Sequence, residues 1–213
     1  MITPAIDGLL IAGARPALLL LHGAAASHLA LAPLAPLLPG PELIIPSLPG
    51  RLGSLGPPLS TVAALAAWAA ALVRQLGHHQ IVVAGHSLGG AIALELALSE
   101  PDLVCGLALI ASGARLRVLP EILAATTNEP AASDWRACDT FDRLSSLAAV
   151  HVPTRIIHGT NDPLTPPKYQ DWLVANITGA KRDAIVGAGH DVVGERPLEV
   201  ANALGALWSR FAP

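Results

Sequence analysis

Short runs of branched apolar residues, bounded by turn-forming residues, alternate along the chain with longer segments in which apolar residues recur at helical spacing. This alternation is typical of a mainly parallel β-sheet with helices on both faces, because parallel strands are buried on both sides. Six runs are predicted strands and one is a weaker candidate: 17–23, 42–46, 80–85, 103–112, 154–159 and 181–187, with 7–13 the weaker. The pattern therefore predicts an α/β fold, a three-layer α/β/α sandwich.

Four segments between or after these runs have the periodicity of helices. Ser60 or Thr61 is the expected cap of the first, which ends at Gly77. Its apolar face consists of Val62, Leu65, Ala69, Leu72 and Leu76. Three further helices are expected to begin close to Ser87, Pro166 and Pro197.

Residues 113–147 break the alternation. This segment contains helix-like pieces interrupted by Pro120 and Pro130, and it holds no convincing strand. It lies between two of the predicted strands. We therefore expect a single domain spanning residues 1–213, with 113–147 as a short helical cap inserted within it.

Charge and cysteine content exclude several classes of function. The net charge of −3 and the absence of any run of Lys or Arg disfavour nucleic acid or an anionic membrane as a partner. Cys105 and Cys138 stand far apart, without His or Cys at ligand spacing, so neither a disulfide framework nor a metal site is expected.

Two apolar segments could be mistaken for targeting or membrane elements. Residues 15–27 resemble a secretory signal, but the basic residue comes late, after Asp7, and cleavage would remove a predicted core strand. Residues 62–73 are too short to span a bilayer, which needs about 20 apolar residues. We expect a cytoplasmic protein with no stable membrane association.

The stretch AGHSLGG, residues 84–90, lies between a predicted strand and a predicted helix. A serine hydroxyl is a weak nucleophile, so it needs exposure, a base and donors for an oxyanion. Gly85 and Gly89, two positions before and after Ser87, permit a sharp strand-to-helix turn. This context favours Ser87 as a nucleophile over a serine that merely fits a tight connection.

A general base is expected among the eight histidines. His190 lies in the Gly-flanked stretch VGAGHDVV, just after a predicted strand, where a mobile imidazole can reach Ser87. His78 and His79 fit an exposed helix end, and His86 is expected to point away from the site. We therefore predict His190 as the base.

The base requires a carboxylate that fixes its tautomer. Asp162 follows the predicted strand 154–159 in the Pro-rich stretch HGTNDPLTPP and is the predicted partner. Three other aspartates are weaker candidates for this role. Asp139 and Asp142 belong to the 113–147 segment, and Asp191 is too close to His190 in sequence to form a good hydrogen bond with its ring. The alternative for Asp162 is a solvated turn residue.

Backbone N–H groups are the expected oxyanion donors. Leu88 begins a helix directly after Ser87, and Ala24 follows His-Gly at the end of the first core strand. Ala25, His28 and Trp135 are possible pocket residues, although Trp135 also fits a half-buried anchor of the cap.

These stretches together resemble the α/β-hydrolase fold superfamily, in particular bacterial serine esterase-like hydrolases with a reduced cap. The quoted motifs carry the resemblance, with PDLVCGLALIASGARLRV, VPTRIIHGTNDPLTPPKY and HGAAASH, where such esterases read His-Gly-Ala-Gly-Gly-Ser-His. The order Ser87, Asp162, His190 matches the family order. The resemblance implies a Ser-His-Asp triad, an acyl-enzyme, no cofactor, a small-molecule ester substrate and a relatively open site.

The chain departs from the family after its second core strand. An Asp and a Gly-His-Gly turn are usual there, whereas Ser47 and Arg51 occupy those places here, so the resemblance does not predict the rim of the site at this point. Fold and triad do not separate ester hydrolysis from C–C bond hydrolysis, thioester hydrolysis or perhydrolysis. A ligand-binding protein with little turnover is the alternative of a different class.

Overall fold

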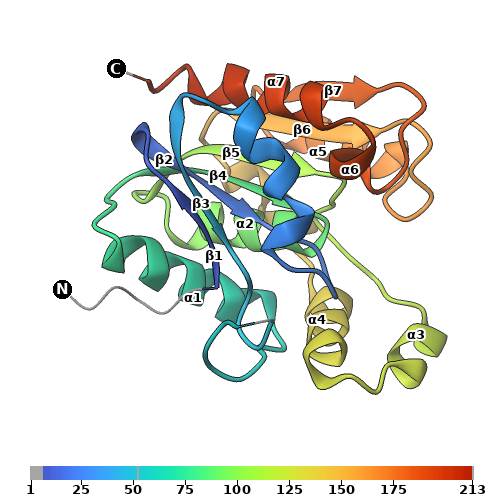
Figure 1. Cartoon of the computed structure of the whole chain (residues 1–213). Coiled ribbons are helices and arrows are strands. Elements are labelled where there is room, and N and C mark those ends of the chain that lie inside the picture. The colour runs from blue at the N-terminus through green and yellow to red at the C-terminus, as the bar shows by residue number, and fades with distance from the viewer. Residues whose placement is uncertain (1–6, 52, 213) are drawn as a thin grey trace.

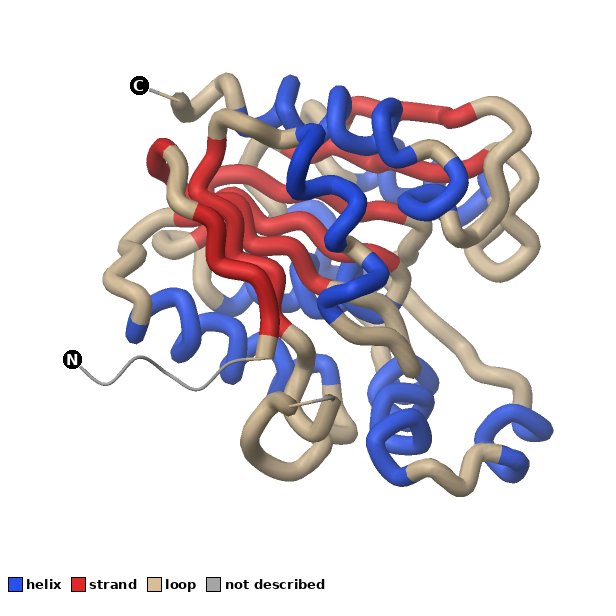
Figure 2. Tube along the Cα trace, in the orientation of Figure 1, coloured by secondary structure: helices blue, strands red, loops and turns tan. Residues whose placement is uncertain are grey.

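The computed structural model describes residues 7–51 and 53–212. Seven strands form one sheet in the order β1-β3-β2-β4-β5-β6-β7 (Figures 1 and 2). Their bounds are β1 Gly8–Ile11, β2 Ala14–Leu21, β3 Pro41–Pro46, β4 Ile81–His86, β5 Val104–Ile110, β6 Thr154–Gly159 and β7 Lys181–Ile185. β1 pairs antiparallel with β3, and all other neighbours pair parallel. The predicted α/β fold is confirmed, the weak strand candidate included.

Helices cover both faces of the sheet (Figure 1). One face carries α1 (Val62–Gln75), α2 (Leu88–Ser99) and α5 (Pro167–Asn176), and the other carries η2 (Ala32–Leu37), α6 (Val192–Glu195) and α7 (Pro197–Trp208). Side chains alternate between the faces, so Leu19 and Leu21 of β2 pack with the first set and Leu18 and Leu20 with the second. The buried part of β2 is therefore apolar on both faces.

Local signals explain where helices begin and end. Thr61 caps α1, because its hydroxyl accepts from Ala64 N–H (3.2 Å), and Gly77 follows the helix with a φ of +79°. No helix within the described ranges is long and apolar enough to cross a membrane.

The β5–β6 segment, residues 113–147, leaves the sheet and carries α3 (Pro120–Ala125) and α4 (Glu129–Thr140). Figure 1 shows both helices standing away from the body of the sheet. Pro120 and Pro130 lie in the first turns of these helices, so the expectation that they interrupt helices is wrong. Proline suits that position because the first N–H groups of a helix have no intrahelical partner.

Candidate active site

Ser87 lies between the last residue of β4 and the first residue of α2. Its φ of 53° and ψ of −116° place a non-glycine residue in a strained conformation. Neighbouring backbone holds it there, because Ser87 N–H donates to Ile110 O (2.9 Å) and Ser87 O accepts from Gly90 N–H (2.9 Å). The structure therefore presents the serine on the predicted strand-to-helix turn.

The flanking glycines of this turn have no room for a side chain. A Cβ at Gly85 would lie 2.0 Å from Gly89 O, and a Cβ at Gly89 would lie 2.0 Å from Leu21 O. Strand β4, helix α2 and the end of β2 thus meet backbone to backbone beneath Ser87. The spacing of the glycines follows from this close approach.

Asp162 and His190 follow the carboxyl ends of β6 and β7, as Ser87 follows β4. His190 Nδ1–H donates to Asp162 Oδ2 (2.8 Å), which leaves Nε2 available for proton transfer. Asp162 also accepts from the N–H groups of Leu164 (2.8 Å) and Thr165 (2.9 Å) and from the Thr165 hydroxyl (2.7 Å). Asp162 is therefore a fixed, fully engaged carboxylate.

These contacts determine the charge of Asp162, whose side chain is buried. Burial opposes ionisation, but the hydrogen bonds from His190 and Thr165 outweigh it and hold the pKa of Asp162 well below its usual range. The carboxylate is consequently ionised at neutral pH. It fixes the tautomer of His190 and can stabilise its imidazolium form.

Ser87 and His190 line one cleft of about 360 Å³, which we call the Ser87 cleft. Within the described chain no hydrogen bond joins their side chains, a separation common in sites without substrate. Apolar side chains supply much of the wall: Ala24, Leu116, Val118, Leu119, Ile122 and Trp135. The arrangement suits a neutral, largely apolar substrate group beside a polar reacting centre.

Cys138 of α4 also lines the Ser87 cleft. Burial, with minor contributions from nearby carboxylates, raises the pKa of this thiol to about 12. It is therefore protonated at neutral pH and a poor nucleophile. Ser87, in contrast, presents a hydroxyl to the same cleft from the strand-to-helix turn.

His86 corrects the expectation that it points away from the site. It lines the Ser87 cleft, its ring centroid lies 5.1 Å from that of His190, and its Nε2–H donates to His190 O (2.8 Å). Burial lowers the pKa of His86, so its ring is the neutral form that this single donation requires. His86 thus positions the loop that carries His190.

The predicted oxyanion donors flank Ser87. Leu88 is the first residue of α2, so its N–H has no helical carbonyl to bind. Ala24 lines the same cleft, and a Cβ on the preceding Gly23 would lie 3.3 Å from Ser87 Cβ. The loop after β2 and the start of α2 therefore approach the serine from two sides.

Buried Asp134 of α4 connects this loop to the β5–β6 segment, a contact that the chain pattern does not predict. Asp134 Oδ2 accepts from Ala25 N–H (2.9 Å) and forms an ion pair with Arg51, which is also buried. Arg51 donates in addition to Pro130 O. Burial is the largest influence on Asp134 and raises its pKa despite the arginine. Only the departure of Arg51 from the family pattern signalled this pair.

Of the three predicted pocket residues, Trp135 lines the Ser87 cleft, whereas Ala25 and His28 do not. Ala25 turns away with a φ of 55° while its N–H binds Asp134. His28 is buried, and its Nδ1 lies 2.9 Å from the hydroxyl of buried Ser47. That hydroxyl donates to Asp7 (3.0 Å). His28 therefore belongs to a separate polar cluster below the loop.

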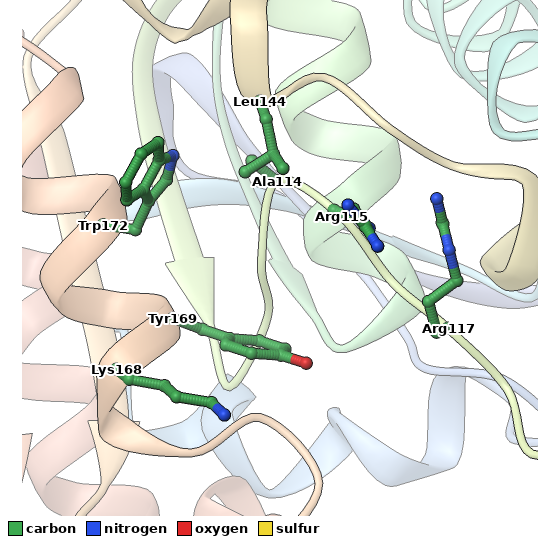
Figure 3. A pocket seen from close by; sticks show the side chains of 7 residues that line it. All are labelled: Ala114, Arg115, Arg117, Leu144, Lys168, Tyr169 and Trp172. Atoms are coloured by element: carbon green, nitrogen blue, oxygen red, sulfur yellow. The ribbon is translucent and has the colours of Figure 1, made fainter.

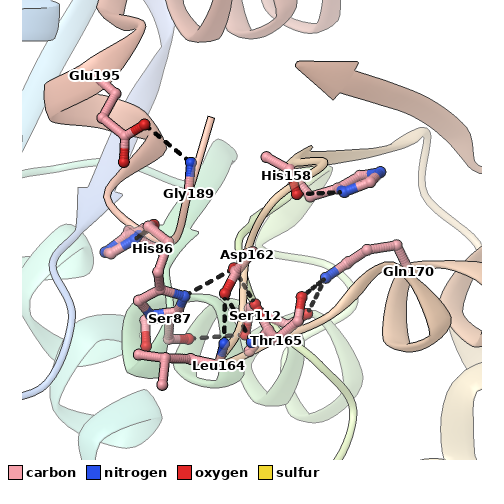
Figure 4. Close-up of polar contacts among 12 residues, drawn as sticks. His86, Ser87, Ser112, His158, Asp162, Leu164, Thr165, Gln170, Gly189 and Glu195 are labelled. Carbon is pink, nitrogen blue, oxygen red and sulfur yellow. Dashed lines mark hydrogen bonds and ion pairs between the residues drawn. The ribbon is translucent and has the colours of Figure 1, made fainter. Parts of the chain in front are cut away.

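A second layer of contacts supports the turn (Figure 4). Ser112, after β5, donates its hydroxyl to Ser87 O (2.8 Å). The fully buried amide of Gln170 donates to Ser112 O (3.1 Å) and to Thr165 O (3.2 Å). These bonds connect the serine turn to the loop of Asp162, so their relative position is fixed.

Known proteins share both fold and sequence features with this chain. The family model described as alpha/beta hydrolase fold matches residues 16–130, more than half of the 213 residues. A pimeloyl-[acyl-carrier protein] methyl ester esterase of Aromatoleum aromaticum is 28% identical, over 83% of this chain and 91% of that protein.

Two solved structures have nearly the same architecture. A thermophilic esterase is 27% identical with a TM-score of 0.80, over 94% of this chain and 92% of its own. The enol-lactonase of Burkholderia xenovorans LB400 is 20% identical with a TM-score of 0.83, over 96% and 95%. With the sheet order and the family match, these similarities place the protein: the chain belongs to the alpha/beta hydrolase fold family and resembles its ester-cleaving members.

Proposed function

We propose that this protein is a serine hydrolase that cleaves carboxylic esters with a triad of Ser87, His190 and Asp162. The observation that carries the proposal is the 2.8 Å bond between His190 and the ionised Asp162, in the cleft where Ser87 is held at positive φ. A serine, a base and an orienting carboxylate in this order are the parts of acyl transfer.

In the first half of the reaction, Ser87 Oγ attacks the ester carbonyl carbon while His190 Nε2 takes the hydroxyl proton. The N–H groups of Leu88 and Ala24 bind the resulting oxyanion. When the bond from the carbonyl carbon to the alkoxy oxygen breaks, His190 returns the proton to that oxygen and the alcohol leaves. Ser87 then carries the acyl group as an ester.

Water completes the cycle. His190 takes one proton as the water oxygen attacks the acyl carbon, and the same two N–H groups bind the second oxyanion. The bond to Ser87 Oγ breaks, and the proton passes from His190 to Oγ. The carboxylic acid leaves, and no cofactor enters either half of the cycle.

The proposed substrate is a small-molecule ester. The apolar wall of the Ser87 cleft favours an aliphatic acyl group, and the related esterase of Aromatoleum aromaticum is named for a methyl ester.

We further propose that residues 113–147 act as a short cap within one domain, since α4 contributes Trp135 and Cys138 to the cleft. A single cooperative unfolding transition of the whole chain would support this organisation.

We also propose a cytoplasmic location. Cys105 and Cys138 are free thiols in the structure, as is usual for proteins of that reducing compartment. Fractionation of the producing cells, with detection of the protein by antibody, tests the location; recovery from an exported fraction would contradict it.

Hydrolysis of short p-nitrophenyl esters tests the function. Ser87→Ala should lower kcat by at least about a thousandfold, because it removes the nucleophile. Ser99→Ala, an exposed serine at the other end of α2, is the matched control and should keep full activity. A fluorophosphonate probe should label the wild type at Ser87, as peptide mass spectrometry would show.

Two results would contradict the proposal. Ester hydrolysis that survives in Ser87→Ala would place the nucleophile elsewhere. Folded wild-type protein that neither cleaves esters nor reacts with the probe, yet retains a small ligand unchanged, would favour a binding protein.

A further inference from the structure

A second cavity of about 430 Å³ adjoins the Ser87 cleft, and we call it the Lys168 pocket. Arg117 and Tyr169 line both cavities, so these two residues form a boundary that the cavities share. Figure 3 shows Lys168, Tyr169 and Trp172 projecting from α5 on one wall, opposite Arg115 and Arg117 from the start of the β5–β6 segment. The pocket is therefore an extension of the site rather than a remote hollow.

Positive charge exceeds negative charge in this pocket. Arg115 and Arg117 share one carboxylate, Asp142, at 3.7 Å and 3.3 Å. In the described part of the chain, Asp142 is the only carboxylate that pairs with any of the three cations. Lys168 instead places its ammonium 5.9 Å from the centre of the Tyr169 ring. The three cations therefore retain attraction for an added anion.

The backbone of the β5–β6 segment holds Arg117 in place. Its Nη1 donates to the carbonyl oxygens of Asp139 (3.0 Å) and Phe141 (3.0 Å), while Nη2 contacts Asp142. A guanidinium fixed in this way loses little entropy when it binds an oxyanion, and its planar fork matches a carboxylate. Tyr169 and Trp172 provide apolar surface for the chain that carries the anion.

From this arrangement we infer that the Lys168 pocket is an anion subsite that binds a carboxylate or similar oxyanion at the far end of the ester substrate. The inference rests on the proposed function and deepens it, because it names the substrate class: esters of dicarboxylic acids with one free carboxylate. The ester group lies at Ser87, the aliphatic chain follows the apolar wall past Arg117, and the free carboxylate meets Lys168 and the two arginines.

Paired substrates test this inference. Monomethyl and dimethyl esters of straight-chain dicarboxylic acids differ only in the remote charge, and an ester with its carboxylate on the alcohol part distinguishes which end enters the pocket. We expect the monomethyl ester to have the higher kcat/KM. Lys168→Gln should lower the ratio of kcat/KM for monomethyl over dimethyl ester about two- to fivefold, as one partly exposed charge pair allows.

Lys181→Gln is the matched control, because Lys181 is an exposed lysine at the opposite end of β7 from the His190 loop. It removes the same charge and should leave the ratio unchanged. Lys168→Glu should lower the ratio further, and added salt should reduce the preference of the wild type because the charges are exposed.

A binding measurement distinguishes an error in the proposed subsite from an error in the proposed function. Calorimetric titration of Ser87→Ala protein should show tighter binding of the monomethyl ester than of the dimethyl ester, and Lys168→Gln in that background should reduce the difference about two- to fivefold. A Ser87-dependent esterase whose ratio is the same in wild type, Lys168→Gln and Lys181→Gln would overturn the subsite and leave the function intact. Lys168-dependent binding without any turnover would overturn the function alone. Preference for the alcohol-side carboxylate would overturn the acyl-side assignment.

Discussion

His22 directly follows β2 with no exposure to solvent, before the loop that approaches Ser87. Its Nδ1–H donates to Gly23 O (2.8 Å), and its Nε2 accepts from Leu48 N–H (3.0 Å). Burial lowers the pKa of His22 to about 4. The ring therefore stays neutral and joins two loops through one donor and one acceptor.

This histidine should make stability depend on pH. The unfolded chain takes up the proton near the ordinary histidine pKa of about 6.5, whereas folded His22 does so only near about 4. Between these values the unfolded state binds more protons, so the free energy of unfolding falls as the pH falls. The full loss is about 3 kcal/mol.

Urea unfolding at several pH values, on the wild type and on His22→Gln, measures this dependence. The variant should be less stable at neutral pH but should lose less on acidification across this window. An NMR resonance of His22 in the folded protein that titrates near pH 6.5 would contradict the expected shift.

Other histidines show what the chain pattern could not predict. Sequence position identified His190 and Asp162 as candidates because strand ends collect at one edge of a parallel sheet. The direction of a side chain depends on the twist of the turn, so His86 was expected on the wrong side. His78 was expected to be exposed after Gly77, but it is buried with its Nε2 3.4 Å from Glu42.

At the scale of elements, the central strands were predictable because each has a buried apolar run that ends in turn residues. The edge strand β7 reads KRDAI and is mostly exposed, so its signal was weaker. Helix α2 has no polar face, since it lies between sheet and neighbouring helices, and only the strand-turn-helix context identified it. Pro120 and Pro130 look alike in sequence whether they start a helix or interrupt one. Their position in the first turn became evident only from the fold.

Two glycine substitutions should have opposite effects. Gly89→Ala forces a Cβ against the backbone of β2, so we expect it to lower the free energy of unfolding by at least about 3 kcal/mol. The fraction of this variant that still folds should have no esterase activity. Gly205→Ala, in open space on α7, should raise the free energy by about 0.5–1 kcal/mol and leave activity intact.

Thermal and urea unfolding of both variants, with p-nitrophenyl ester turnover, provide the measurement. Gly89→Ala protein with wild-type stability and rate would show that α2 can shift to accept the methyl group. Loss of stability in Gly205→Ala would show that α7 is more crowded than the structure indicates.

At the scale of the whole molecule, Asp134 joins three segments that are distant in sequence, through its ion pair with Arg51 and its hydrogen bond from Ala25 N–H. The sequence contains both residues, but their pairing depends on how the β5–β6 segment folds back over the loop after β3. The hydrophobic periodicity of the chain does not predict a contact between residues so far apart in sequence. It could be found only from the tertiary structure.

Asp134→Ala should therefore cost about 3–5 kcal/mol of stability, because it leaves the buried Arg51 without its counter-charge. It should also lower kcat more than it raises KM, since Ala25 N–H loses its acceptor and the adjacent Ala24 N–H loses its fixed position. Asp134→Asn retains an acceptor oxygen and should keep more of kcat than Asp134→Ala.

Asp171→Ala is the control, because it removes an exposed carboxylate paired with Arg182 and should cost no more than about 1 kcal/mol. Urea unfolding and steady-state kinetics on the three variants distinguish the roles. Equal kcat in Asp134→Asn and Asp134→Ala, at equal folded fraction, would show that the acceptor for Ala25 has no part in turnover.

The contacts of Asp134 with Ala25 and Arg51 limit which segments can be exchanged between family members. A chimera that takes residues 113–147 from another family member also replaces the carboxylate that holds Ala25 N–H and neutralises Arg51. Such a graft would alter the chemical step along with substrate choice, unless the donor segment brings an acid at the matching position or Arg51 is exchanged with it. In this protein, residues 113–147 and the loop beside Ser87 form one physical unit and have to be exchanged together.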